Sequence, residues 1–136
     1  MIIELMTNEL IRDEGKRNHV YTDTVGVPTI GVGRNLRDVG LSDDEVSYLL
    51  GNDINRVCAE LDAAIPWWRE MTEARQRCIT NMAFNLGITG LMGFKNTLAA
   101  MKAGRYGEAA SGMLASRWAS QVGQRAKLLS TMMDEG

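Results

Sequence analysis

Two carboxylates and one hydroxyl near the N-terminus have the chemistry that glycoside hydrolysis requires. Glu14 ends a predicted helix, Asp23 precedes a predicted hairpin turn, and Thr29 lies on the facing strand. In such a reaction one protonated carboxyl donates to the leaving oxygen, while an ionised one activates water or attacks the anomeric carbon. A threonine hydroxyl could hold that water. The chain has 17 acidic residues, so spacing alone does not single out this pair.

The elements that would position these groups follow from apolar spacing and glycines. Residues 3–13 carry apolar side chains at helical spacing, and Gly15 is well placed to end that helix. The run from His19 to Gly33 is rich in β-branched residues and glycines, which predicts a short hairpin turning near Val25-Gly26. A helix end that folds back on this hairpin can place Glu14 and Asp23 across one cleft.

A long helix is predicted next. Ser42 and Glu45 form a capping box, in which the hydroxyl and the carboxylate each satisfy an orphan backbone donor. Apolar residues then recur at steps of three and four until Pro66 ends the pattern. We expect this helix, about 20 residues long, to bridge two lobes.

The rest of the chain is predicted to be helical. Thr72 caps a helix that ends near Gly87, and a further helix stops at Gly104. Two more helices are expected around residues 109–114 and 126–133. The nine methionines occur mostly at helical spacing, which favours core filler over an adaptable binding surface.

These elements predict an α+β, mostly helical fold in which a small β-hairpin lobe is joined by a long helix to a helical lobe. We expect one domain over residues 1–136. Its small lobe would cover about residues 12–60 and its helical lobe about residues 61–136, with the N-terminal helix 3–13 packing at the junction.

Charge differs between the two parts of the sequence. Residues 1–65 hold 6 Lys and Arg against 12 Asp and Glu, a net charge of −6, whereas residues 66–136 hold 9 against 5, a net charge of +4. The basic part could lie against an anionic polymer such as a cell-wall glycan carrying peptide carboxylates, although scattered surface charge explains it as well. The arginines are spread out, which disfavours nucleic-acid binding.

The sequence gives little support for a metal site or for a catalytic nucleophile activated by histidine. Cys58 and Cys78 lie in helical patterns without metal-type spacing and are expected to be free thiols. His19, the only histidine, has no neighbouring ligand or nucleophile motif and is expected on the surface or in hairpin packing. No metal or cofactor is predicted.

The N-terminal residues Met1-Ile2-Ile3 are followed at once by Glu4, so no secretory signal is recognised, and no long apolar run occurs. We expect synthesis in the host cytoplasm and no stable membrane insertion. Action on a cell wall would then follow release by a separate membrane-permeabilising protein.

Several ordered motifs carry a family resemblance. Asp13-Glu14-Gly15, Tyr21, Asp23, Gly26 and Thr29-Ile30-Gly31-Val32-Gly33 resemble the active-site signature of glycoside hydrolase family 24, the phage lysozyme family. The similarity extends from about residue 8 to residue 133, and its further motifs are Asn81-Met82-Ala83-Phe84-Asn85, Gly93-Phe94 with Asn96, Ser116-Arg117-Trp118, and Gln121 with Arg125-Ala126.

The resemblance implies a role for each matching residue. Glu14 matches the general acid, Asp23 the carboxylate that works with water, and Thr29 the residue that positions it. Arg125 matches an arginine of the helical lobe that reaches the catalytic glutamate. Other matching positions would line the sugar cleft: Phe84, Asn85, Thr97 and Gln121. From the residues alone, Arg125 could also be a cap or a surface ion pair, and Phe84 could be core.

The chain also departs from the family pattern. The segment between Gly33 and Leu41 is short, so the outer strand of the small lobe is expected to be trimmed. Arg34 stands where some relatives have a histidine, and Asp53 stands where they have its acidic partner. We therefore expect an ion pair between Arg34 and Asp53 that ties the small lobe to the long helix.

The resemblance implies a monomeric muramidase that hydrolyses the β-1,4 bond between N-acetylmuramic acid and N-acetylglucosamine in bacterial peptidoglycan. A catalytically silent peptidoglycan-binding module is the alternative, although it would not need to keep Glu14, Asp23 and Thr29 together. A small nucleic-acid-binding protein fits poorly with the acidic N-terminal part. A lytic transglycosylase would use one glutamate and leave an anhydro sugar.

Overall fold

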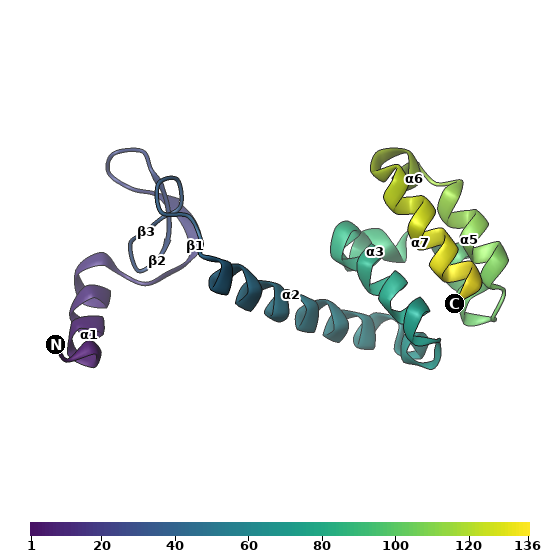
Figure 1. Cartoon of the computed structure of the whole chain (residues 1–136), viewed down its shortest axis with the longest axis horizontal. Coiled ribbons are helices and arrows are strands. Elements are labelled where there is room, and N and C mark those ends of the chain that lie inside the picture. Colours follow the sequence, from purple (N-terminus) through teal and green to yellow (C-terminus); the bar gives the residue numbers. More distant parts are fainter. The chain divides into compact units, whose positions relative to one another are not determined.

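A computed structural model describes all residues, 1–136, and contains seven α-helices, one 3₁₀ helix and three β-strands (Figure 1). This confirms the mostly helical α+β fold with a small antiparallel sheet. The chain divides into two compact units, Met1–Tyr48 and Leu49–Gly136. The division falls inside the long helix that the sequence predicts.

The first unit begins with α1 (Ile3–Glu14), which ends one residue later than predicted. Gly15 ends the helix as expected, because its φ of 79° lies in the left-handed region that glycine tolerates best. Its N–H donates to the carbonyl of Ile11 at 2.9 Å and satisfies one of the last carbonyls of the helix. The side chain of Glu14 therefore leaves the last position of α1.

The three strands form one antiparallel sheet in the order β1-β2-β3. They are β1 (Arg17–Thr22), β2 (Pro28–Gly31) and β3 (Arg34–Asn35), and the predicted hairpin is confirmed by the turn between β1 and β2. β3 is only two residues long, in line with the expected trimming of the outer strand. β2 is thus the central strand, and Thr29 on it pairs with Tyr21 on one side and Asn35 on the other.

β1 is irregular in its middle. Arg17 pairs with Gly31 and Tyr21 pairs with Thr29, so β1 advances four residues where β2 advances two. The intervening residues 18–20 therefore bulge out of the ladder, as extra residues in one strand of a pair do. Such bulges re-aim side chains, and this one ends three residues before Asp23.

α2 (Asp43–Ala64) has 22 residues and starts at the predicted capping box. The N–H of Ser42 donates to Glu45 Oε1 at 3.0 Å, and the N–H of Glu45 donates to Ser42 Oγ at 3.2 Å. Pro66 follows the helix, as expected.

The predicted ion pair between Arg34 and Asp53 is wrong. Arg34 Nη1 instead donates to Glu45 Oε1 at 2.8 Å and to the carbonyl of Gly40 at 3.0 Å, while Asp53 pairs with Arg56 at 3.0 Å. Asp53 lies eight positions beyond Glu45 on the same helix, about 12 Å along its axis, so an arginine that binds one carboxylate does not reach the other. Arg34 still ties β3 to the start of α2.

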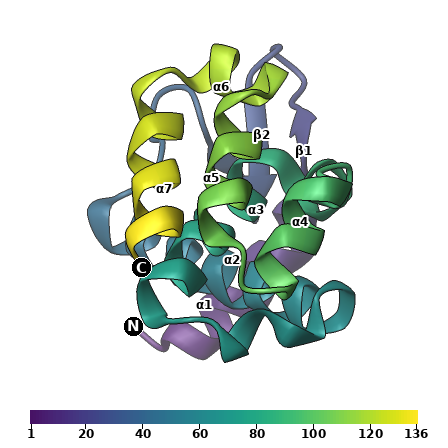
Figure 2. The same cartoon turned by 90° about the vertical axis from the view of Figure 1, so that its right-hand side faces the viewer.

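The second unit contains the end of α2 and a set of short helices. They are η1 (Pro66–Glu70), α3 (Glu73–Met92), α4 (Lys95–Lys102), α5 (Tyr106–Leu114), α6 (Arg117–Val122) and α7 (Gln124–Glu135). Figure 2 shows α5 and α7 lying side by side in this unit. The core between the helices includes Leu61, Ile79, Met82, Met113 and Met133, all with no accessible surface. Five of the nine methionines are buried, which supports the prediction that they are mostly core residues.

The helix boundaries differ from the prediction in two places. Gly87 interrupts α3 with a φ of 73°, but another helical turn follows it up to Met92. α6 was not predicted as a separate helix, since it is only six residues long. Its cap is local, because the Ser116 hydroxyl accepts from the N–H of Ala119 at 3.2 Å. None of the helices combines the length and the apolar character that crossing a bilayer requires.

Candidate active site

Asp23 is held in place by the backbone of the hairpin turn. Its Oδ1 accepts hydrogen bonds from the N–H groups of Val25 at 2.9 Å and Val27 at 2.8 Å. The N–H of Asp23 donates to the carbonyl of Val27 at 2.9 Å, which closes the turn. Oδ2 accepts no hydrogen bond from the protein. One oxygen of the carboxylate thus fixes its orientation while the other stays free to receive a proton.

Thr29 lies beneath this turn on the central strand. Its side chain is 3% exposed, and its hydroxyl donates to the carbonyl of Val27 at 2.9 Å. Because that bond uses the hydroxyl hydrogen, the lone pairs of Oγ1 remain as acceptors. Val27 therefore links Asp23 and Thr29, since its N–H binds the carboxylate and its carbonyl binds the hydroxyl.

Glu14 approaches the turn between β2 and β3. A methyl group added at Gly33 would lie 3.0 Å from Glu14 Oε2 and 3.2 Å from its Cδ, so the absence of a side chain at Gly33 gives the carboxyl its place. Gly33 also has a φ of 68°, which a side chain would disfavour. The Gly31-Val32-Gly33 segment thus brings the end of α1 next to β2, the strand that carries Thr29.

The first unit therefore assembles all three predicted catalytic residues on the end of α1 and one hairpin. It supplies an exposed carboxyl, a turn-anchored carboxylate and a buried hydroxyl. This set can donate a proton, accept a proton from water, and hold that water. Their catalytic roles stay predictions.

Arg125 on α7 is bound within the second unit by an asparagine of α3. Its Nε and Nη2 both donate to Asn81 Oδ1, at 2.9 and 2.7 Å. One turn further along α3, Asn85 Oδ1 accepts from Trp118 Nε1 at 2.8 Å. Two asparagines four residues apart thus connect α3 to α6 and α7. That Arg125 faces Glu14 stays a prediction.

Arg125 and Phe84 line an open groove of about 630 Å³ in the second unit. Phe84 is 44% exposed there, which favours a surface role over a place in the core. The lining of the groove is mostly apolar and includes several polar groups, among them Gln76, Thr80 and Asn81. Such a mixture of apolar surface and a few polar groups is typical of small-molecule and glycan sites.

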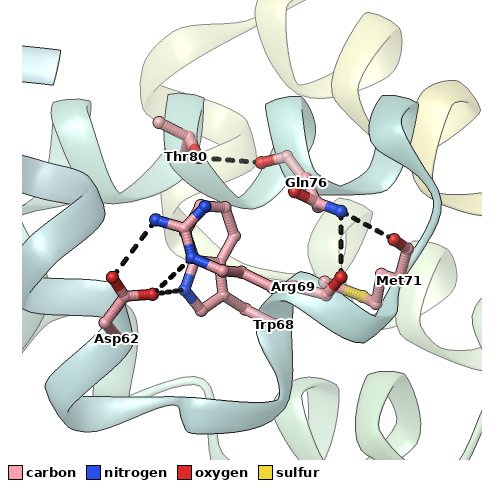
Figure 3. A network of polar contacts seen from close by, with 6 residues as sticks. All are labelled: Asp62, Trp68, Arg69, Met71, Gln76 and Thr80. Carbon is pink, nitrogen blue, oxygen red and sulfur yellow. Dashed lines mark hydrogen bonds and ion pairs between the residues drawn. The ribbon is translucent and has the colours of Figure 1, made fainter. Parts of the chain in front are cut away.

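One wall of this groove is fixed by a polar network around η1 (Figure 3). Asp62 accepts from Trp68 Nε1 at 2.7 Å and from Arg69 Nε at 2.7 Å, and the Arg69 guanidinium lies 4.5 Å from the centre of the Trp68 ring. Gln76 Nε2 donates to the carbonyls of Arg69 and Met71. The hydrogen bonds from Arg69 and then from Trp68 hold the pKa of Asp62 below its usual value.

The remaining predicted sugar contacts differ in accessibility. Gln121 on α6 and Asn85 on α3 are exposed. Thr97 on α4 is 7% exposed, and its hydroxyl faces Gly112 of α5, where a methyl group would come within 2.5 Å of it. A threonine packed in this way has little surface to offer a sugar, so of the predicted contacts Thr97 has the weakest structural support.

No group of three or more His, Cys, Asp and Glu side chains is arranged to hold a metal ion. Both cysteines are free, as expected. Cys78 is buried, its thiol donates to the carbonyl of Leu129 at 3.2 Å, and burial raises the pKa of that thiol to about 12. A thiol that stays protonated at neutral pH is a packing residue and not a nucleophile.

Two contributors to the site were missed from the sequence. Gly33 was noted only as part of a motif, although it makes room for Glu14. Asn81 was likewise quoted without a role, although it binds Arg125. The four-residue spacing of Asn81 and Asn85 places both on one helix face, and that spacing was the available signal.

Comparison with known proteins identifies the family. The phage lysozyme family model matches residues 12–132. The pre-baseplate central spike protein Gp5 of Enterobacteria phage T4 is 30% identical over 159 residues, which include 96% of this chain and 28% of the spike protein. Probable T4-type lysozyme 1 of Dictyostelium discoideum is 23% identical over 153 residues, which include 91% of this chain and 90% of that protein. The chain spans less than a third of the first relative and nearly all of the second, and by the family match it belongs to the phage lysozyme family.

Proposed function

We propose that this protein is an endo-acting muramidase that hydrolyses the β-1,4 bond between N-acetylmuramic acid and N-acetylglucosamine in bacterial peptidoglycan. The observation that carries the proposal is the family match over residues 12–132, together with Glu14, Asp23 and Thr29 standing on one helix end and one hairpin. A pure binding module has no need of two carboxylates and a water-holding hydroxyl in this arrangement.

In the proposed reaction Glu14 is the general acid. Its protonated carboxyl donates to the glycosidic oxygen as the bond to the anomeric carbon breaks, so the leaving sugar departs with a neutral hydroxyl. The support for this role is its exposed position at the end of α1, where the carboxyl lies against Gly33.

Asp23 and Thr29 then act on water. Thr29 Oγ1 accepts a hydrogen bond from the water, and the free Oδ2 of Asp23 takes its proton as the water oxygen attacks the anomeric carbon. The product carries a new hydroxyl at that carbon, and attack from the face opposite the leaving oxygen inverts the configuration. The hydrogen bonds to Asp23 Oδ1 support different roles for the two carboxylate oxygens, with Oδ1 orienting the side chain and Oδ2 taking the proton.

Substrate contacts are proposed for the second unit at Phe84, Asn85, Thr97, Gln121 and Arg125. The open groove at Phe84 and Arg125 supports two of these positions. The two hydrogen bonds that Arg125 donates to Asn81 Oδ1 support a fixed guanidinium in that groove, able to contact polar groups of a glycan.

The test compares the wild-type protein with Asp23→Asn on purified peptidoglycan. Asparagine keeps Oδ1 for the N–H groups of Val25 and Val27, so the turn should survive, but its amide nitrogen replaces the oxygen that takes the proton. We expect the wild type to release soluble fragments with reducing ends and the variant to release about 10²- to 10⁴-fold fewer.

Other outcomes separate the remaining hypotheses. Binding of the wild type to peptidoglycan without release of fragments would favour the silent binding module. Fragments that end in anhydro sugars, which differ from reducing ends by one water, would favour a lytic transglycosylase. Full activity of a folded Asp23→Asn variant would remove Asp23 from its role.

A further inference from the structure

The basic residues at the start of β1 differ from the other basic residues of the first unit. Lys16, Arg17 and His19 follow one another closely on β1 and the residue before it, and all three are exposed. None of them lies within ion-pair distance of a carboxylate, since the salt bridges of the first unit involve other cations. The salt bridges in this unit are Arg12 to Asp13, Arg34 to Glu45 and Arg37 to Asp38.

This distribution is unusual because the first unit is acidic. Residues 1–48 hold five Lys and Arg against nine Asp and Glu, so carboxylates are in excess. Three of the five cations have acidic partners, and the two without one, Lys16 and Arg17, are neighbours in the chain. Unpaired cations that gather on one strand create a local positive potential on an otherwise negative surface.

The backbone of β1 gives this cluster a concave shape. Residues 18–20 bulge out of the pairing with β2, and residues 16–21 line a hollow of about 430 Å³. The Arg17 guanidinium carbon lies 4.6 Å from the centre of the Tyr21 ring, so the side chain spans the bulge along the strand. A guanidinium held over a ring loses less conformational freedom when it binds an anion than a free one does.

The hollow lies beside the proposed catalytic residues. Tyr21 pairs directly with Thr29, and Asp23 follows Tyr21 by two positions. From these placements we infer that the β1 hollow, lined by Lys16, Arg17 and His19, is an anion subsite that binds a carboxylate or phosphate group of the cell-wall polymer whose sugar is cleaved next to it. This inference rests on the proposed function for the identity of the polymer.

The side chains of the hollow suit an oxyanion. Arg17 offers planar paired N–H donors, Lys16 a point charge, and His19 an imidazole N–H. Two sources could supply the anion, namely the free carboxylates of peptides attached to peptidoglycan and the phosphates of anionic wall polymers. An uncharged glycan would make none of these contacts.

The test measures binding of the full chain to insoluble purified cell walls by co-sedimentation. All proteins carry Glu14→Gln, so that the walls are not cleaved during the measurement. In this background Lys16→Gln with Arg17→Gln should weaken binding about fivefold at low salt, because two charge contacts are lost. The matched control, Lys102→Gln with Lys127→Gln, removes two exposed, unpaired lysines of the second unit and changes net charge equally. The control should bind like the Glu14→Gln parent.

Chemically altered walls distinguish the two sources. If the peptide supplies the anion, amidation of the wall carboxylates weakens binding of the parent to the level of the double variant, and removal of phosphate polymers does not. If phosphate supplies it, the reverse holds. In either case the double variant should lose the salt sensitivity that the parent shows.

The inference is overturned if the double variant binds as well as the control pair, or if neither treatment of the walls weakens binding of the parent. Thermal unfolding of the double variant should match the parent, because both side chains are exposed. A failure of the proposed function would be seen separately, as a wild-type protein that binds walls and cleaves none of them. In that case the wall binding of the double variant relative to its parent would still decide whether the hollow binds an anion.

Discussion

Met1–Tyr48 and Leu49–Gly136 differ in how they hold their side chains. Considered by itself, the first unit buries only Val27 and Thr29, whereas the second contains a continuous core of apolar residues from several helices. Hydrogen bonds hold side chains in position in the first unit, whereas apolar packing holds them in the second. Asp23 is oriented by two backbone N–H groups, and α2 begins at a capping box that also binds Arg34.

The difference indicates a division of tasks. The two carboxylates proposed to be catalytic, Glu14 and Asp23, would have to meet polar substrate atoms and water, and neither is buried. The hairpin turn orients Asp23 through two backbone N–H groups, while its carboxylate stays accessible. The second unit, with Leu61, Ile79 and Met82 fully buried, supplies the stability and presents the groove at Phe84.

Glu14→Gln should separate the two tasks most sharply. The change keeps the shape of the side chain and removes the transferable proton, so kcat on peptidoglycan should fall by about 10²- to 10⁴-fold. Because Glu14 is exposed, thermal unfolding should stay within error of the wild type. Glu9→Gln, an exposed position earlier on α1, is the matched control and should keep full activity. Substantial activity of a folded Glu14→Gln protein would remove Glu14 from its role.

Met82→Ala should lower the stability of the protein, the property that Glu14→Gln leaves unchanged. Met82 is fully buried in the second unit, so its truncation should lower the free energy of unfolding by about 2–5 kcal/mol. Met92 lies on the same helix and is 40% exposed, so Met92→Ala should change that free energy by less than about 0.5 kcal/mol. Denaturant unfolding measures both. Equal effects of the two substitutions would contradict the core described for this unit.

Gly33→Ala tests whether local backbone geometry positions the acid. The new methyl group would lie 3.0 Å from Glu14 Oε2 and must displace it by a few tenths of an ångström, so kcat should fall about tenfold. Gly31→Ala is the control, because Gly31 has nearly the same φ but a methyl group added there would meet no atom within 4 Å. Both variants should lose about 1–2 kcal/mol of stability to backbone strain, which denaturant unfolding measures. A Gly31 variant as inactive as the Gly33 variant would show that strain alone lowers activity.

Glu45→Gln should have the smallest effect, and one that depends on pH. Hydrogen bonds from Arg34 and then from Ser42 lower the pKa of Glu45 from 4.5 to about 2. A lowered pKa means that the carboxylate stabilises the fold fully above about pH 4.5 and loses this contribution as the pH falls toward 2. The difference in Tm between wild type and variant should therefore be largest at neutral pH and shrink toward pH 2. A constant difference over that range would show that Glu45 acts by packing alone.

Much of the fold could be predicted because it follows from local patterns. Gly15 ended the first helix within one residue of the prediction, and the capping box at Ser42 marked the start of α2. The hairpin followed from its β-branched residues and glycines. Glu14, Asp23 and Thr29 were singled out by resemblance, since spacing alone did not select the two carboxylates from 17 acidic residues.

Features that depend on tertiary placement were predicted less well. The predicted partner of Arg34 was wrong. Glu45 and Asp53 lie about two turns apart on α2, and the sequence pattern does not show which of these turns lies next to β3. The burial of Thr97 depends on how closely α5 approaches at Gly112. The spacing of Asn81 and Asn85 places them on one helix face, but it does not show that α7 lies beside α3 and brings Arg125 to Asn81.

In the proposed mechanism a water molecule, held by Thr29 and deprotonated by Asp23, attacks the anomeric carbon of N-acetylmuramic acid while Glu14 protonates the leaving oxygen. Digestion of purified peptidoglycan in ¹⁸O-labelled water, followed by mass spectrometry of the fragments, tests it most directly. We expect reducing N-acetylmuramic acid ends that carry one ¹⁸O atom, and we expect the rate of their formation to collapse in Asp23→Asn. Unlabelled anhydro ends, or label found on the N-acetylglucosamine side of the cleaved bond, would contradict it.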